Sequence, residues 1–187
     1  MEELALHILD LMENALEAQA ALILVQVCED HHKGRLRVII QDDGRGMTRE
    51  EVQAVCAPFF TTRQERPVGL GLALWRQAAE SCGGRTWIDS APGEGTLVGA
   101  EFQLGHVDLP PMGDLAGTLA VFLGGSPQVD VVLRYTVDGR SWTFDTRQVR
   151  EVLGPVPLNH PPVVRWIREY CSENMARLGR SEEDDQP

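Results

Sequence analysis

Three short motifs occur in a fixed order along the first half of the chain, and their order constrains the fold more than any other feature. The first is an acid-rich segment that contains an asparagine, residues 10–15 (DLMENA). The second, residues 42–47 (DDGRGM), is a carboxylate pair followed by glycines at alternate positions. The third, residues 69–72 (GLGL), is a glycine pair that opens an apolar stretch. A lone Gly-x-Gly is a weak signal, but the ordered set is specific, with residues 58–63 (PFFTTR) before the third motif.

The spacing of apolar residues predicts alternating helices and strands around these motifs. Apolar side chains recur every three or four residues over residues 2–19, which is the pattern of an amphipathic helix. Residues 21–28 and 35–41 are rich in valine, isoleucine and leucine and flank a polar turn, so they predict a β-hairpin. Thr48, with Glu51 three residues later, predicts a capped helix start. The same patterns predict strands over 85–90, 96–104, 129–137 and 141–144, a linker over 106–113, and helices over 70–81, 114–123 and 161–178, the last with Trp166, Ile167 and Tyr170 on its apolar side.

Charge and composition argue against several classes of function. The formal net charge is −11, which argues against DNA or RNA as a partner, because neutralising phosphates takes clustered lysine and arginine. No apolar run approaches the roughly 20 residues that cross a bilayer, and the acidic N-terminal sequence is unlike a signal peptide, so we expect a cytoplasmic protein. The four cysteines are isolated, and the one spacing that suggests a metal site, Cys28 with His31 and His32, falls in a polar turn. We therefore expect no metal cluster there.

In these motifs the chain resembles the GHKL superfamily, which comprises DNA gyrase, heat-shock chaperones, mismatch-repair ATPases and the catalytic domains of sensor histidine kinases. Residues 93–96 (GEGT) are similar to a late Gly-x-Gly-Thr hairpin of the kinase catalytic domains. The resemblance extends over residues 2–105. The boxes of the family correspond to residues 10–18 (N box), 42–46 (G1 box), 59–63 (F box) and 69–72 (G2 box).

The resemblance implies a Bergerat-type ATP-binding fold, an α/β (α+β) two-layer sandwich, for residues 1–107. Residues 108–180 would then form a small C-terminal α/β appendage. The acidic residues 181–187 are expected to be a disordered tail.

The same resemblance implies ATP and Mg²⁺ as cofactors and assigns the contacts to adenine and the metal. Asp42 would accept the exocyclic amine of adenine, and Thr96 would support that contact through water. Gly44 and Gly46 would let the backbone approach the base and sugar, because glycine has no Cβ. Asn14 would hold magnesium against the triphosphate, since magnesium needs few protein ligands.

Asp10 lies one helical turn before Asn14, on the same face of the predicted helix. The resemblance leaves two roles open for it: the general base that activates the attacking water, or a second magnesium ligand. Aspartate is one methylene shorter than the glutamate of the family's ATPases, so turnover is expected to be slow.

The phosphates are expected at the third motif. Gly69 and Gly71 stand at the start of a predicted helix, whose first amides form an anion site, and Arg63 can donate two hydrogen bonds to the γ-phosphate. The remaining nucleotide-binding residues that the resemblance implies are Met47, Phe60, Thr61, Leu70 and Leu72.

Two classes of function remain open. In the first, the protein is an enzyme, either a histidine-kinase-like phosphotransferase that acts in trans or a slow ATPase. In the second, it is a nucleotide-gated binding module that resembles anti-sigma factors. The neighbours of His7 lack the pattern of a phospho-acceptor, so the acceptor is expected on a separate protein. Residues 137–140 (VDGR) and 144–147 (FDTR) resemble small bacterial GHKL proteins encoded beside iron hydrogenase subunits, so the expected partner belongs to such a set or to a two-component system.

Overall fold

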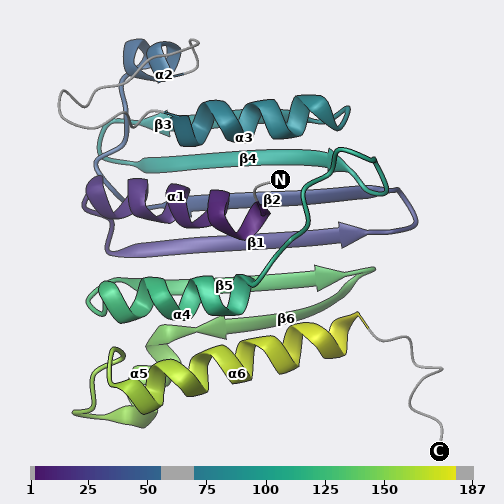
Figure 1. Ribbon diagram of the computed structural model, residues 1–187. Coiled ribbons are helices and arrows are strands. Elements are labelled where there is room, and N and C mark those ends of the chain that lie inside the picture. Colours follow the sequence, from purple (N-terminus) through teal and green to yellow (C-terminus); the bar gives the residue numbers. More distant parts are fainter. Residues whose placement is uncertain (1–2, 56–69, 180–187) are drawn as a thin grey trace, which may run out of the picture.

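The structure, a computed structural model, describes residues 3–55 and 70–179. Its six strands form one mixed sheet, and its longer helices lie along one face of that sheet (Figure 1). This arrangement confirms the predicted two-layer α/β sandwich. The elements in chain order are α1 (Leu4–Glu17), β1 (Leu22–Asp30), β2 (Arg35–Asp42), α2 (Arg49–Val55), α3 (Leu70–Ser81), β3 (Arg85–Ala91), β4 (Gly95–Gln103), α4 (Leu115–Gly125), β5 (Asp130–Val137), β6 (Arg140–Asp145), α5 (Thr146–Leu153) and α6 (Pro161–Leu178).

The strand order across the sheet is β3-β4-β2-β1-β5-β6. The pairs β1–β2, β2–β4, β3–β4 and β5–β6 are antiparallel, whereas β1 and β5 run parallel. Alternate residues of a strand point to opposite faces, so each strand places one row of side chains under the helices. On β1, β2 and β5 this row is buried and largely apolar, as at Val25, Val38 and Leu133.

The helices complete the core from the other side. On α1, Leu4, Ile8 and Leu11 recur at helical spacing and are buried, which confirms the predicted amphipathic helix. On α3, Trp75 is fully buried and packs edge-on against Phe102 of β4 with ring centroids 5.2 Å apart. The helices α1 and α3 therefore share one apolar layer over the first four strands.

The short helix α2 begins with the predicted capping box. The amide of Thr48 donates to the Glu51 carboxylate at 2.7 Å, and the Glu51 amide donates to the Thr48 hydroxyl at 3.2 Å. The two bonds satisfy amides that a helix start otherwise leaves without partners.

The C-terminal part of the chain extends the same sheet. Strand β5 pairs with β1 along residues 22–29, and α4 contacts both α1 and α6 (Figure 1). The elements from α4 to α6 thus share a sheet and a helix layer with the preceding part. The division into a domain of residues 1–107 and an appendage of residues 108–180 stays a prediction about how the chain divides.

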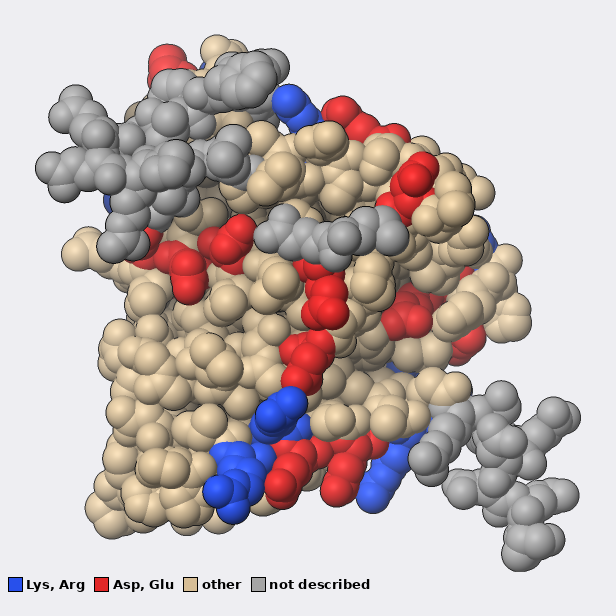
Figure 2. Space-filling view, viewed as in Figure 1, with Lys and Arg blue, Asp and Glu red and all other residues tan. Residues whose placement is uncertain are grey.

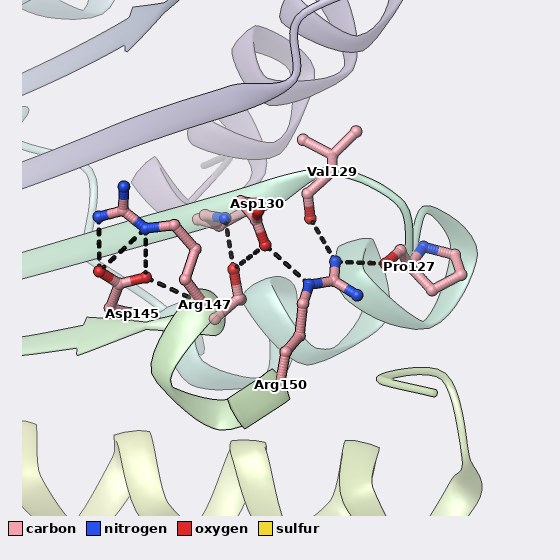
Figure 3. Close-up of polar contacts among 8 residues, drawn as sticks. Pro127, Val129, Asp130, Asp145, Arg147 and Arg150 are labelled. Atoms are coloured by element: carbon pink, nitrogen blue, oxygen red, sulfur yellow. Dashed lines mark hydrogen bonds and ion pairs between the residues drawn. The ribbon is translucent and has the colours of Figure 1, made fainter. Parts of the chain in front are cut away.

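Helix α5 was not predicted, because side-chain hydrogen bonds rather than an apolar stripe hold it in place. Its buried residue, Thr146, donates to the Asp130 carboxylate at 2.8 Å and accepts the amide of Val131 at 2.9 Å. Arg150 donates to Asp130 at 2.8 Å and to the carbonyl of Pro127 at 2.5 Å (Figure 3).

The predicted helix over residues 161–178 is present, but the expected apolar side is wrong for Trp166 and Tyr170, which are both exposed. Helix α6 buries Val163, Ile167 and Cys171, which recur every four residues. Trp166 falls beside that stripe, is 45% exposed, and stacks on Tyr170 with ring centroids 4.9 Å apart. Spacing outweighs hydrophobicity here, because a helix buries the side chains on one face only.

Candidate functional site

The predicted adenine contact, Asp42, lies at the end of β2 with its side chain buried. It shares the core-facing row of the sheet with Ile40 and pairs in register with Thr96 of β4. One carboxylate oxygen accepts the amide of Gly44 at 2.8 Å. Burial raises the pKa of the Asp42 carboxyl above its usual value, and the amides of Gly44 and Thr96 oppose that rise.

The glycines of the second motif are required by the packing of the loop. A Cβ on Gly44 would lie 2.7 Å from the carbonyl oxygen of Ala18, at the end of α1, and 2.8 Å from Asp42 Oδ1. Gly46 has a φ of 65°, in the left-handed region, and a Cβ there would collide with the carbonyl oxygen of Ala91. The loop is therefore wedged between the end of α1 and the β3–β4 hairpin.

Backbone hydrogen bonds hold this loop on both sides. The amide of Arg45 donates to the Ala18 carbonyl at 2.9 Å, and the amide of Gly93 donates to the Arg45 carbonyl at 2.8 Å. Asp43 is exposed, and its carboxylate accepts the amides of Ala21 and Leu22 at 2.8 and 2.9 Å.

Sequence reasoning missed Ser90, which joins three parts of this site. Its hydroxyl accepts the amide of Met47 at 2.9 Å, lies 2.9 Å from the Thr96 hydroxyl, and lies 2.8 Å from the Gly95 carbonyl. A signal for it was present, because Ser90 follows Thr86 and Ile88 on the row of β3 that faces the helices. A hydroxyl in that row next to the glycine motif indicates a polar contact rather than core packing.

The structure brings the first and third motifs together across the helix layer. Asp10 and Asn14 are exposed on α1, and a Cβ added to Gly71 of α3 would lie 3.4 Å from the Asp10 side chain. The first turn of α3 thus lies within van der Waals reach of the Asp10 side chain. Leu72 is half-buried and packs against the core.

Several predicted contacts fall outside the described residues. These are the side chain of Leu70, which opens α3, and the residues Phe60, Thr61, Arg63 and Gly69.

The described residues fit ATP with magnesium by the chemistry of their donors. A buried carboxylate beside a loop that has no room for a Cβ at Gly44 or Gly46 suits a flat base with an exocyclic amine. Oxygen donors are the ligands that magnesium prefers. Asp10 and Asn14 supply a carboxylate and an amide oxygen on one helix. Residues 3–55 and 70–179 contain no group of three or more His, Cys, Asp or Glu side chains that could hold a metal by themselves.

His7 is buried in α1 beside Trp75, with ring centroids 5.8 Å apart, so its imidazole is enclosed rather than presented to a phosphoryl donor.

Among the described helices, none combines the length and the hydropathy that crossing a bilayer requires.

Comparison with known proteins finds relatives for the first part of the chain. A family model described as "Histidine kinase-, DNA gyrase B-, and HSP90-like ATPase" matches residues 2–106. The sensor histidine kinase ZraS of Klebsiella oxytoca is 41% identical over 75 residues, which are 40% of this chain and 15% of that protein. The sensor histidine kinase GacS of Pseudomonas protegens is 31% identical over 96 residues, 46% of this chain and 10% of that protein. The chain therefore spans a small fraction of these kinases.

Among solved structures, the ATPase domain of Aquifex aeolicus MutL in complex with ADP is 15% identical, with a TM-score of 0.49. The match covers 82% of this chain and 69% of the MutL chain.

Proposed function

Because the chain belongs to the histidine kinase-, DNA gyrase B- and HSP90-like ATPase family, we propose that it binds ATP with magnesium and acts with it on a separate protein partner. The observation that carries the proposal is Asp42, a buried carboxylate at a strand end, beside a loop in which Gly44 and Gly46 leave no room for a Cβ. One of its oxygens accepts the Gly44 amide, and the carboxylate keeps further lone pairs with which to accept the adenine amine.

This arrangement distinguishes the two purines. Guanine presents a carbonyl where adenine presents its amine, and two acceptors facing each other leave a buried polar group unsatisfied. Such a group costs about 1–3 kcal/mol, so ATP should bind roughly ten- to a hundredfold more tightly than GTP.

The phosphates would lie between α1 and the start of α3, where Asp10 approaches Gly71. Magnesium, when bound, would neutralise charge on the phosphate oxygens, with Asn14 as its protein ligand. Asp10 would take one of two roles: it would hold a proton from the attacking water, or it would complete the metal site. Both roles use the exposed position of its carboxylate on α1.

Because His7 is buried in α1, its position supports phosphoryl transfer to another protein rather than to this histidine. The family members to which the chain is similar include sensor kinases, which supports a partner from a two-component or similar signalling system.

Calorimetry with ATP, GTP and ATP without magnesium tests the binding proposal on the unmodified chain. We expect ATP to bind only weakly without magnesium and GTP to bind weakly or not at all. Equal affinities for ATP and GTP would contradict the role of Asp42.

A further inference from the structure

The face of the sheet opposite the helices carries its own rows of side chains. Helices α1, α3, α4 and α6 lie over one face (Figure 1), and they bury Leu36, Val38 and Ile40 of β2. The alternate residues of β2, among them Arg35 and Arg37, therefore point to the other face, and both are exposed.

Three arginines on this face share one carboxylate. Glu101 of β4 is buried, and it receives Arg37 Nη2 at 2.9 Å and Arg35 Nη1 at 3.4 Å, with Arg85 Nε at 3.9 Å. The arginine side chains remain 58%, 51% and 71% exposed for Arg35, Arg37 and Arg85. Three guanidinium groups on one carboxylate leave a local excess of positive charge, and most of their donors still face solvent.

Apolar side chains adjoin these arginines. The guanidinium of Arg85 lies 6.0 Å from the ring centre of Trp87, and Trp87 covers Gly99 of the neighbouring strand. Ile39 of β2 pairs in register with Gly99 of β4.

The row continues across the sheet to a fourth arginine. Ile39 pairs with Gln26 of β1, and Gln26 pairs with Arg134 of β5. Arg134 is exposed and makes no ion pair with another described residue. We call the surface formed by Arg35, Arg37, Arg85, Arg134, Trp87 and Ile39 the arginine face.

The positive charge of this surface is opposite in sign to the net charge of the molecule. The net charge is −11, and acidic side chains are spread over the helix-covered face (Figure 2). Arginine and tryptophan are the residue types that dominate binding energy at protein interfaces, and a guanidinium matches a carboxylate with two parallel hydrogen bonds. The buried Glu101 holds the arginines in place, which lowers the entropy lost when a partner binds.

We propose that the arginine face docks an acidic protein segment in which apolar side chains adjoin the carboxylates. Apolar side chains of such a segment would pack on Trp87 and Ile39, and its carboxylates would pair with the surrounding arginines. A nucleic acid fits less well, because a long polyanion meets the repulsion of the whole chain. The surface lies on the opposite side of the sheet from α1 and α3, so the proposal does not depend on nucleotide binding.

The test uses the full chain without nucleotide and a short fluorescein-labelled peptide of glutamate and leucine. Fluorescence anisotropy should show binding that weakens as salt rises, and no binding of the same peptide with glutamine in place of glutamate. The double variant Arg37→Gln with Arg134→Gln should lose affinity by at least about tenfold, the size expected for hydrogen bonds to charged groups. The matched control is Arg165→Gln, an exposed arginine on α6, which should bind as the unmodified chain does.

Arg134→Gln alone guards against a folding artefact, because this residue has no ion pair within the described chain to lose. It should weaken binding severalfold with an unchanged melting temperature. Equal affinity for the glutamine peptide, or full affinity in the double variant, would overturn the proposal. Duplex DNA binding that the double variant loses would assign the face to nucleic acid. A dimer in sedimentation velocity that the double variant abolishes would assign it to a second copy of the chain.

Discussion

Asp42 carries more of the proposed recognition than any other single residue, and its substitution tests the pocket directly. In Asp42→Asn the side chain has a single oxygen. The backbone amide of Gly44, which donates to Asp42 Oδ1 in the unmodified chain, would take that oxygen as its acceptor. The adenine amine would then face an NH₂ group. We expect ATP affinity in calorimetry to fall at least about tenfold, the size of a lost hydrogen bond to a charged group.

The matched control for Asp42→Asn is His31→Ala. His31 lies in the turn between β1 and β2, at the opposite end of β2 from Asp42, where it hydrogen-bonds to Asp138 at 3.0 Å. The variant His31→Ala should leave ATP affinity unchanged. Normal affinity in Asp42→Asn would show that adenine binds elsewhere.

Asp10 separates catalysis from simple binding. If its carboxylate takes a proton from the attacking water, Asp10→Asn should cut phosphate release by about a hundredfold to ten-thousandfold while ATP affinity stays nearly the same. Glu13→Gln, an exposed acid on the same helix, is the control and should change neither quantity. Unchanged turnover in Asp10→Asn would exclude it as the base, and a loss of magnesium-dependent affinity would make it a metal ligand.

At the scale of elements, α5 depends on a polar network that can be removed one atom at a time. Thr146→Val keeps the shape of the side chain but leaves the Val131 amide without its acceptor. An unsatisfied buried amide costs about 1–3 kcal/mol, so the free energy of unfolding in urea should fall by that amount. Thr143→Val, at an exposed position on the neighbouring strand β6, should change it little. Equal stability of both variants would mean that α5 is held by other contacts.

The cluster at Glu101 ties three strands together in a pH-dependent way. The hydrogen bond from Arg37, with the charges of Arg35 and Arg85, holds the pKa of the Glu101 carboxyl below its usual value despite its burial. A lowered pKa means that the folded state favours the charged form. The resulting stability is fully present above the usual pKa of glutamate and is lost as the pH falls through the lowered one.

Melting curves of Glu101→Gln against pH check this sign. The variant should melt below the unmodified chain at neutral pH, and the gap should close as the solution becomes acidic. A gap that stays constant across that range would mean that Glu101 contributes packing rather than charge.

Local elements of this fold could be predicted from the sequence, whereas their long-range assembly could not. The hairpins and the helices α1, α3, α4 and α6 follow from apolar spacing and turn residues. Likewise, the order of the motifs predicts the glycine-containing loop that begins at Asp42. The parallel pairing of β1 with β5 leaves no local trace, because it joins segments far apart in the chain. Helix α5 and Ser90 depend on hydrogen bonds to residues that only the fold brings near.

At the scale of the whole molecule, β1 is an interior strand only because β5 covers its outer edge. Truncation after residue 107 would expose that edge and the side of α1 that contacts α4. It would also remove the buried side chains of Leu119, Leu123 and Leu133. An uncovered apolar edge strand promotes aggregation.

We therefore expect residues 1–107 to lose cooperative melting in circular dichroism and to aggregate, although residues 2–106 are what the family model matches. Removal of residues 180–187 is the control and should leave the melting temperature unchanged, because the acidic sequence there has few apolar groups to bury. If residues 1–107 melt cooperatively at the temperature of the full chain, the predicted boundary separates two units that fold independently. If they do not, the C-terminal region is a structural part of the ATP-binding fold, and substitutions at the β1–β5 junction should also weaken ATP binding.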